Sequence, residues 1–137
     1  MIDCIFCKII AGEVPSYKIY EDADFYCFLD ISQFVEGHTL VVPKQHFTYI
    51  WDVPNIAEYF KVVQKVGQHF LKDLGYKYVD TMTFGRIVPH AHVHVLPHNG
   101  DNAEWDAALS KLGDFTQDQK RRLTKEKGEI LAKKFQF

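Results

Sequence analysis

The alternation of apolar and polar positions predicts three strands in the first third of the chain. Residues 24–31 are mostly apolar at both alternating sets of positions, which is typical of a central strand that is buried on both faces. Residues 17–21 and 37–43 form the strands before and after it. The latter ends at Pro43, which has no N–H to donate to a strand ladder. Because the connections are short, we expect an antiparallel sheet.

A helical period follows over residues 52–74. Apolar residues recur there at steps of three and four and form one stripe that can cover a face of the sheet: Ile56, Tyr59, Phe60, Val63, Val66, Phe70 and Leu74. Asp52 is a suitable N-cap, Pro54 is tolerated in the first turn, and Gly75 is placed to end the helix. His69 lies off the stripe, so we expect it to be exposed.

Two further strands, residues 77–84 and 88–96, and a second helix from Thr116 complete the pattern. Thr116 and Gln119 have the spacing of a capping box at the start of that helix. We therefore predict an α+β fold, in which an antiparallel sheet of about five strands carries a long central helix and a C-terminal helix.

The composition is that of a folded domain. The 137 residues are 47% apolar and 25% charged, and a chain of this length buries a core without needing disulfides. We expect a single domain over residues 1–137, with its motifs within about 4–97 and a helical extension over about 104–137. A net charge of −2 argues against a dedicated nucleic-acid or membrane-surface protein. The basic excess from Thr116 onward, seven basic against three acidic residues, is interpreted as a solvated helix face.

The cysteine count and the start of the sequence bear on the compartment. Three cysteines, an odd number, with no secretory signal predict a reducing environment, and we expect a cytoplasmic protein. No run approaches the roughly 18 apolar residues of a membrane span, so no membrane partner is expected.

Residues 89–98 hold four of the seven histidines. As a strand, this segment places His90, His92 and His94 on one face, lining a surface or cleft, and small aliphatic residues on the other. An affinity tag does not fit an internal, alternating segment. Three neighbouring core histidines would all need hydrogen-bond partners, so we interpret the cluster as functional.

Two chemistries fit these imidazoles, metal binding and catalysis. Residues i and i+4 of a strand lie roughly 13 Å apart at Cα, so three ligands on one ion would be strained without outside ligands. A central imidazole is instead suited to attack phosphorus, because neutral histidine uses one nitrogen as nucleophile while a hydrogen bond holds the other. We expect His92 to be this nucleophile, with His90 and His94 supplying protons or donors to phosphoryl oxygens.

Three motifs follow one another along the chain. They are Cys4-Ile5-Phe6-Cys7-Lys8-Ile9-Ile10-Ala11-Gly12-Glu13-Val14-Pro15, the segment from Phe28-Leu29-Asp30-Ile31-Ser32 through Gly37-His38-Thr39-Leu40-Val41-Val42-Pro43-Lys44-Gln45-His46, and His90-x-His92-x-His94-Val95-Leu96. In order and spacing they resemble the motifs of the histidine triad (HIT) family. The resemblance implies a nucleotide hydrolase or transferase. In it, His92 attacks the α-phosphorus of a purine nucleoside phosphoramidate or dinucleoside polyphosphate, and water frees the nucleotidyl-histidine intermediate. It also implies a homodimer with a continuous sheet.

The resemblance also implies roles for individual residues. Asp30 matches the acid that hydrogen-bonds the ribose hydroxyls, and His38 matches a histidine behind the triad that helps to hold its geometry. An apolar wall around the base is matched by Phe6, Ile9, Phe28, Ile31 and Leu40. For Phe6, Phe28 and Ile31, ordinary core packing is an equally good interpretation, because both roles require a buried apolar residue.

The chain departs from the family pattern just before the triad. Members usually have Gly-Gln-Ser/Thr-Val-x-His, whereas this chain has Gly85-Arg86-Ile87-Val88-Pro89-His90. We expect Arg86 to contact phosphate in place of the glutamine, because its guanidinium forks onto phosphate oxygens. An asparagine expected upstream is also absent, where residues 79–84 offer only Thr81 and Thr83. These departures bear on substrate choice and turnover more than on nucleotide binding.

Cys4 and Cys7 are a C-x-x-C pair that could serve redox chemistry or metal binding, or be a chance spacing. A redox pair follows a strand and opens a helix, which the terminal position does not suggest. A tetrahedral zinc site needs two more ligands, for which His46 and His90 are the candidates, and many bacterial-type members of the resembled family bind a structural zinc in this way. We therefore predict a structural zinc on Cys4, Cys7, His46 and His90, and expect Cys27 to be a buried apolar residue.

Three hypotheses of function follow. The first is a nucleotide hydrolase working through His92, with His94 beside it if zinc takes His90. The second is a zinc-stabilised purine-nucleotide-binding module with little turnover, because the usual glutamine and serine are missing. The third is a catalytic metalloenzyme centred on the triad, which the strand geometry favours least.

Overall fold

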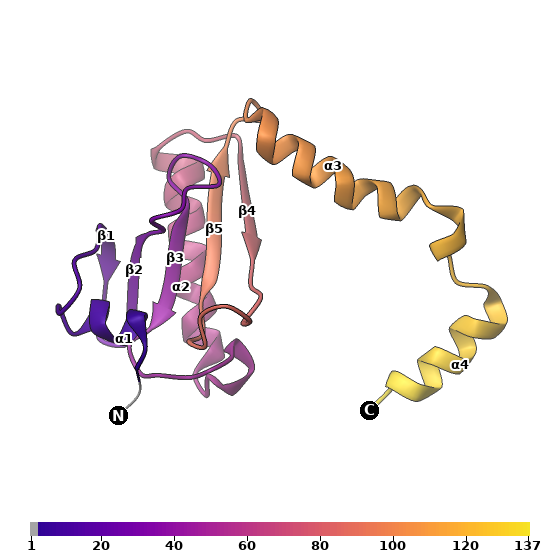
Figure 1. Ribbon diagram of the computed structural model, residues 1–137, viewed down its shortest axis with the longest axis horizontal. Coiled ribbons are helices and arrows are strands. Elements are labelled where there is room, and N and C mark those ends of the chain that lie inside the picture. Colours follow the sequence, from indigo (N-terminus) through magenta and orange to yellow (C-terminus); the bar gives the residue numbers. More distant parts are fainter. Residues whose placement is uncertain (1–2) are drawn as a thin grey trace. The chain divides into compact units, whose positions relative to one another are not determined.

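The computed structural model describes residues 3–137, which form two compact units that divide after Asn102. The first unit contains the predicted antiparallel sheet of five strands, in the order β1-β2-β3-β5-β4 (Figure 1). The strands are β1 (Lys18–Glu21), β2 (Phe25–Leu29), β3 (Thr39–Pro43), β4 (Tyr78–Met82) and β5 (Val93–His98). Every neighbouring pair is antiparallel, and β2 lies between β1 and β3 with both faces covered, as its apolar pattern predicts.

The helix α2 (Ile56–Gln68) covers one face of this sheet (Figure 1). It buries Tyr59, Val63 and Val66 against residues of β2, β3 and β5. The Tyr59 hydroxyl donates to the Val41 carbonyl at 2.6 Å, which ties the helix to the middle of β3. The predicted stripe is wrong in part. Val62 is buried, whereas three predicted members are exposed: Ile56, Phe60 and Leu74.

The predicted helix over residues 52–74 is also divided differently. A 3-10 turn (Ile50–Asp52) precedes α2, whose N-cap is Asn55 rather than Asp52. The break falls at Val53, which is extended because the following Pro54 disfavours helical geometry in the residue before it. After Gln68 the chain continues as a π-helical turn (His69–Asp73), and His69 is exposed, as expected.

A short helix that the sequence pattern did not indicate, α1 (Ile5–Ile10), packs on the opposite face of the sheet (Figure 1). It contributes Phe6 and Ile9 to a second apolar cluster, with Tyr26, Phe28, Leu40 and Val42 from the strands. Six residues are too few for a stable isolated helix, so packing rather than local propensity holds it. The expected burial of Cys27 is observed between α2 and the sheet.

The segment of the three histidines is not a strand throughout. We predicted a strand over residues 88–96, but β5 begins only at Val93, so His90 and His92 precede it. Pro89 has no N–H for a ladder, and the next two amides bond locally or to another loop, from His90 to the Val88 carbonyl and from Ala91 to the Phe47 carbonyl. The three imidazoles therefore do not share one strand face.

The second unit, Ala103–Phe137, is helical. It consists of α3 (Ala103–Gln117), a 3-10 turn (Gln119–Arg121) and α4 (Lys125–Phe135), and neither described helix buries a residue. The predicted helix start at Thr116 is wrong. Thr116 lies in the last turn of α3 and donates to the Gly113 carbonyl, whereas Thr124 caps α4 by accepting from the Lys127 amide. Among residues 3–137, no helix is both long enough and apolar enough to cross a membrane.

Candidate functional site

Two histidines from neighbouring strands form a hydrogen-bonded pair at one end of the sheet. His38 lies just before β3 and His94 lies on β5, and His38 Nε2 and His94 Nδ1 are 2.8 Å apart. His38 Nδ1 lies 3.0 Å from the Ser32 carbonyl, which can only accept, and 3.3 Å from the Phe34 amide, which can only donate. The shorter contact places the proton on Nδ1. His38 Nε2 then accepts from His94 Nδ1–H. The remaining nitrogen of neutral His94, Nε2, therefore has a free lone pair.

A second carbonyl sets which ring nitrogen of His92 carries a proton. His92 Nδ1–H donates to the His90 carbonyl at 2.7 Å, which leaves the Nε2 lone pair free. The Thr83 hydroxyl donates to the His92 carbonyl at 2.8 Å and so joins the two ends of the loop between β4 and β5. The ring of Phe6 on α1 makes an edge contact with the His92 imidazole, with centroids 5.4 Å apart. The backbone therefore fixes a proton on His92 Nδ1 and leaves Nε2 as the nitrogen that can act as a nucleophile.

Burial controls the charge of the His38–His94 pair. Burial, reinforced by the neighbouring His92 and His38, lowers the pKa of His94 to about 4. Burial also lowers the pKa of His38, although Asp30 and the Ser32 carbonyl oppose that shift. The Asp30 carboxylate lies 3.6 Å from His38 Nε2 and 4.0 Å from His94 Nδ1. Both imidazoles are consequently neutral near pH 7.

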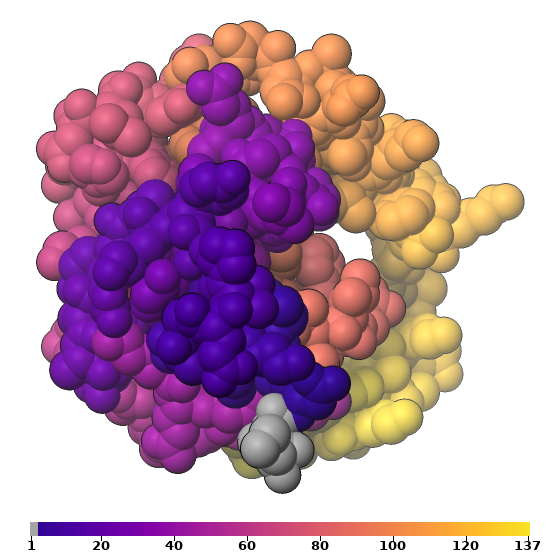
Figure 2. Space-filling model, turned by 60° about the vertical axis from the view of Figure 1, so that its left-hand side comes forward, coloured from indigo at the N-terminus to yellow at the C-terminus, as the bar shows by residue number. Residues whose placement is uncertain are grey.

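A cavity of about 570 Å³ opens beside His92 and His94. Figure 2 shows the segments that border it at the surface beside one another: the N-terminal segment in indigo, residues in the thirties in purple and the loop before β5 in salmon. Among the predicted site residues, those that line the cavity are Phe6, Ile9, Phe28, Asp30, Ile31, Leu40, Arg86, His92 and His94. His38 lies behind His94 and does not line it, and neither does His90.

The cavity residues differ in burial. Phe6 and Phe28 are buried and touch each other edge to face at 5.5 Å, so they belong both to the core and to the cavity wall. The alternative of core packing is wrong for Ile31, which is 86% exposed. Arg86 and Ile87 lie on the exposed loop, with Ile87 94% exposed. The cavity thus has an apolar interior and a more open rim.

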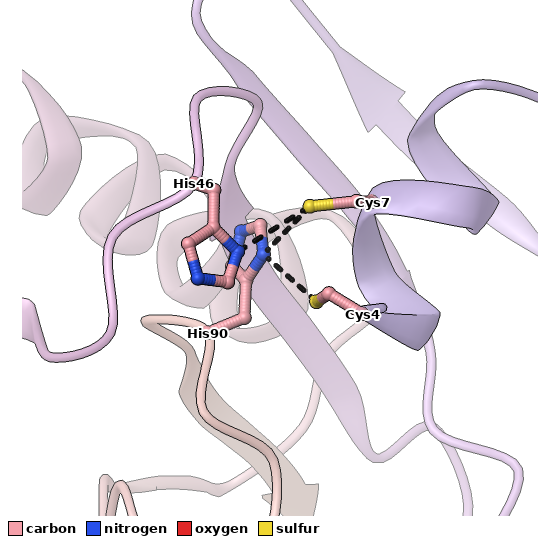
Figure 3. A group of neighbouring side chains, drawn as sticks. All are labelled: Cys4, Cys7, His46 and His90. Carbon is pink, nitrogen blue, oxygen red and sulfur yellow. Dashed lines mark hydrogen bonds between the residues drawn. The ribbon is translucent and has the colours of Figure 1, made fainter. Parts of the chain in front are cut away.

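The four residues predicted to bind zinc come together (Figure 3). Cys4 and Cys7 come from the start of α1, His46 follows β3, and His90 precedes β5. The measured distances from sulfur to Nδ1 are 3.4 Å for Cys4–His90, 3.4 Å for Cys7–His46 and 3.6 Å for Cys7–His90. Tetrahedral zinc at the usual bond lengths separates sulfur and nitrogen ligands by about 3.6 Å, so the arrangement fits this ion.

His90 belongs to this cluster rather than to the cavity. Its Nε2 lies 2.8 Å from the Pro43 carbonyl and must donate to it, which leaves the Nδ1 lone pair directed at the two sulfurs. Burial lowers the pKa of His90, so the ring is in the neutral form that a metal requires. With both nitrogens engaged, His90 cannot donate to a substrate in the cavity, contrary to the role we expected. Its carbonyl instead orients His92.

Sequence reasoning missed the contacts that three residues make in the site. Thr83 was noted only as a substitute for an absent asparagine, yet it holds the His92 carbonyl. The Phe34 ring stacks on His94 at 6.3 Å and lies 4.7 Å from His38, and the Phe84 ring makes an edge contact with His94 at 6.0 Å. Both aromatics lie in loops, where no periodicity marks them as part of a site.

Comparison with known proteins places these features in a family. The family model described as "HIT domain" matches residues 11–101. "Protein hit" of Bacillus subtilis is 39% identical, over 82% of this chain and 82% of its own. An adenosine 5′-monophosphoramidase of Candida albicans is 35% identical, over 93% of this chain and 96% of its own. An adenylylsulfatase of Arabidopsis thaliana is 31% identical, over 75% of this chain and 56% of its own.

Solved structures agree with these relatives. A HIT family member from Bacillus subtilis superposes with a TM-score of 0.69 at 33% identity, over 90% of this chain and 99% of that one. A zinc-bound histidine triad family protein from Mycobacterium smegmatis superposes with a TM-score of 0.64 at 30% identity, over 82% of this chain and 96% of that one. The predicted α+β fold is confirmed by this likeness.

Proposed function

The chain belongs to the HIT family, and on that premise we propose that it is a nucleotide hydrolase whose nucleophile is His92. The observation that carries the proposal is the 2.7 Å hydrogen bond from His92 Nδ1–H to the His90 carbonyl, in a residue that lines the cavity. A neutral imidazole with a free Nε2 lone pair is the form that attacks phosphorus. The names of the Candida and Arabidopsis relatives, a phosphoramidase and an adenylylsulfatase, support hydrolysis of a nucleotide conjugate.

The reaction proceeds in two displacements at the α-phosphorus of a purine nucleoside phosphoramidate or dinucleoside polyphosphate. The His92 Nε2 lone pair forms a P–N bond, and the bond to the leaving group breaks with its electron pair on that group. An amine leaving group also takes up a proton from solvent, whereas a phosphate departs as an anion. Water then attacks the nucleotidyl-histidine, its oxygen forms the new P–O bond, and its proton leaves to solvent. The P–N bond breaks and returns the electron pair to Nε2. Throughout, the His90 carbonyl holds Nδ1–H and stabilises the positive charge that the ring carries in the intermediate.

The other cavity residues bind and orient the nucleotide. Asp30 accepts hydrogen bonds from the ribose hydroxyls, a role supported by its position in the cavity lining and by the fit of a carboxylate to a vicinal diol. The base packs on the apolar wall of Phe6, Ile9, Phe28, Ile31 and Leu40. His94 keeps its place beside His92 through its bond to His38.

We also assign a structural zinc ion to Cys4, Cys7, His46 and His90, supported by the sulfur–nitrogen distances and by the zinc-bound relative. The ion would supply a cross-link between α1 and the two loops that carry the histidines. The alternative of a metal centre at the triad has less support. His90 turns to the cysteines, and the facing nitrogens of His38 and His94 bond to each other.

Family membership further supports a homodimer whose sheet continues across the two copies. β4 is an edge strand, whose outer backbone groups are open to pairing. Exposed Trp51 and Phe60 supply apolar area outside the cavity. We further propose that the second unit is a helical extension of one HIT-like domain, and that the protein is cytoplasmic, in keeping with its three free cysteines.

His92→Ala tests the proposed function. We expect it to lower release of nucleoside monophosphate by roughly a thousandfold or more, because the nucleophile is lost. Acid-quenched wild type incubated with substrate should show a mass increase of one nucleotidyl group, which His92→Ala lacks. His69→Ala is the matched control and should remain active, because it removes an exposed imidazole from the π-helical turn after α2.

Two results would contradict the proposal. An active His92→Ala protein would exclude His92 as nucleophile. Micromolar nucleotide binding by calorimetry, with no turnover of any conjugate by the wild type, would favour the purine-nucleotide-binding module instead.

A further inference from the structure

The cavity beside His92 contains two charged side chains among its described lining residues, Asp30 and Arg86. Asp30 lies close to the His38–His94 pair. Arg86 makes no ion pair or hydrogen bond with any residue in the described range 3–137, although its guanidinium has five N–H donors. An anionic part of a ligand is repelled by Asp30 and attracted by Arg86. The cavity therefore has one place that favours an anion, and it is the Arg86 side.

The loop that carries Arg86 is fixed to the catalytic segment. Thr83 at its start donates to the carbonyl of His92 at its end. Gly85 has a φ of 65°, and a Cβ there would lie 3.0 Å from the Tyr49 ring, so this position requires glycine. The backbone on the N-terminal side of Arg86 is thus held against Tyr49, while the other end of the loop leads into His92. Arg86 therefore belongs to the reacting end of the cavity.

We propose that Arg86 binds the leaving group and makes the enzyme selective for nucleotide conjugates whose leaving group is an oxyanion, over conjugates whose leaving group is an amine. The inference rests on the proposed function, because it assumes attack by His92 at the α-phosphorus. Sulfate and a phosphate chain share the required chemistry, since each presents several anionic oxygens to a guanidinium fork.

The supply of protons in the cavity favours the same selectivity. When an anhydride P–O bond breaks, its electron pair stays on the bridging oxygen, and sulfate or phosphate departs as an anion without needing a proton. When a P–N bond breaks, the amine must take up a proton. Neutral His94 has one N–H, and that proton is held by His38. The residue after Arg86 is Ile87, whose side chain carries no proton donor.

Kinetics on three conjugates of the same nucleoside test the proposal. The leaving group is an oxyanion in adenosine 5′-phosphosulfate and in a diadenosine polyphosphate. In adenosine 5′-phosphoramidate the leaving group is an amine. We expect wild type to have the higher kcat/KM on the first two. Arg86→Gln should lower these two values by roughly tenfold to a hundredfold, the usual effect of a lost hydrogen bond to a charged group, and change the phosphoramidate value by less than about threefold. Arg86→Lys should restore part of the loss, because it keeps the charge but not the fork.

Lys61→Gln is the matched control, since it removes one positive charge from α2 on the opposite face of the sheet. It should leave all three values unchanged. A loss confined to one oxyanion conjugate would support the proposal and identify its source. An equal loss on all three conjugates would assign Arg86 to the nucleotide instead, and no loss, or a wild type that prefers the phosphoramidate, would also overturn the proposal. Failure of the proposed function gives a different result, which is a wild type inactive on all three or an active His92→Ala.

Discussion

Two backbone carbonyls determine the chemistry available to the imidazoles of the site. The carbonyl of Ser32 accepts a hydrogen bond from His38 Nδ1–H, which leaves His38 Nε2 as an acceptor for His94. The carbonyl of His90 accepts a hydrogen bond from His92 Nδ1–H. A carbonyl cannot donate, so geometry alone assigns the proton of His92. At His38 the 3.0 Å contact to the Ser32 carbonyl is preferred to the 3.3 Å contact from the Phe34 amide. Nucleophilicity at His92 is thus a property of the loop backbone as much as of the side chain.

The buried His38–His94 pair predicts a stability that depends on pH. The pKa of His94 is about 4 in the folded protein, whereas an unfolded histidine titrates near 6.5. Between these values the unfolded chain binds a proton that folded His94 does not. The free energy of unfolding therefore falls as the pH drops from about 6.5 toward about 4, by up to about 3 kcal/mol from this group.

Urea unfolding at a series of pH values measures this effect. In His94→Asn the decline over that window should be shallower than in wild type, whatever its stability at pH 7.5. His69→Asn, which replaces an exposed histidine, should keep the wild-type slope. Parallel slopes for His94→Asn and wild type would show that His94 is already protonated in the folded protein above pH 6.

At the scale of elements, the sequence predicted those that have a long apolar period or a closing proline. β2, β3 and the body of α2 are of this kind. The antiparallel pairing expected from the short connections between the first three strands is observed as well. The pattern could not reveal α1, because six residues carry too little periodicity and their helix is held by the sheet. Alternation at residues 88–96 likewise resembled a strand, although Pro89 and the local amide bonds delay β5 to Val93.

The candidate site was predicted better than the elements that carry it. The Cys4, Cys7, His46 and His90 set lies together as expected, because metal-ligand chemistry restricts the residue types so strongly. What could not be predicted is the direction in which each imidazole points. The sequence left His90 either to the substrate or to the metal. The bond from Nε2 to the Pro43 carbonyl and the sulfur contacts of Nδ1 show that neither nitrogen faces the cavity.

The loop between β4 and β5 gives a prediction at this scale. Gly85 and Gly12 both have a positive φ, 65° and 77°, but only at Gly85 would a Cβ meet a neighbour, the Tyr49 ring at 3.0 Å. We expect Gly85→Ala and Gly12→Ala each to lower the free energy of unfolding by roughly 1–2 kcal/mol, the cost of left-handed geometry for alanine. Gly85→Ala alone should also reduce kcat/KM, by about tenfold or more, because the loop that positions His92 must shift.

Thermal unfolding and steady-state kinetics on the same two proteins separate the effects. Wild-type activity in both variants would mean that the loop tolerates displacement and that Thr83 alone holds the His92 carbonyl. Loss of activity in both would point to a general loss of stability rather than to the loop.

For the whole molecule, the proposed zinc site joins segments that the sheet leaves separate. α1, the loop after β3 and the loop before β5 contribute its four ligands (Figure 3). The same α1 supplies Phe6 to the cavity wall, and His90 supplies the carbonyl that orients His92. A change at the metal is therefore transmitted to the catalytic segment through one residue and one short helix.

Removal of zinc should accordingly lower both stability and activity. A ligand whose free concentration is a thousand times its dissociation constant stabilises the folded state by about 4 kcal/mol. Removing such a ligand lowers the Tm of a chain of this size by roughly 10–15 °C. We expect that fall on chelation of wild type and in Cys7→Ser, with one zinc per chain by metal analysis before chelation and none in the variant. Cys27→Ala should retain its zinc, because Cys27 is buried in the core between α2 and the sheet, away from the cluster. If Cys7→Ser keeps one zinc and the wild-type Tm, the metal does not bind at this cluster. If metal-free wild type has an unchanged Tm, the packing of α1 alone holds the site together.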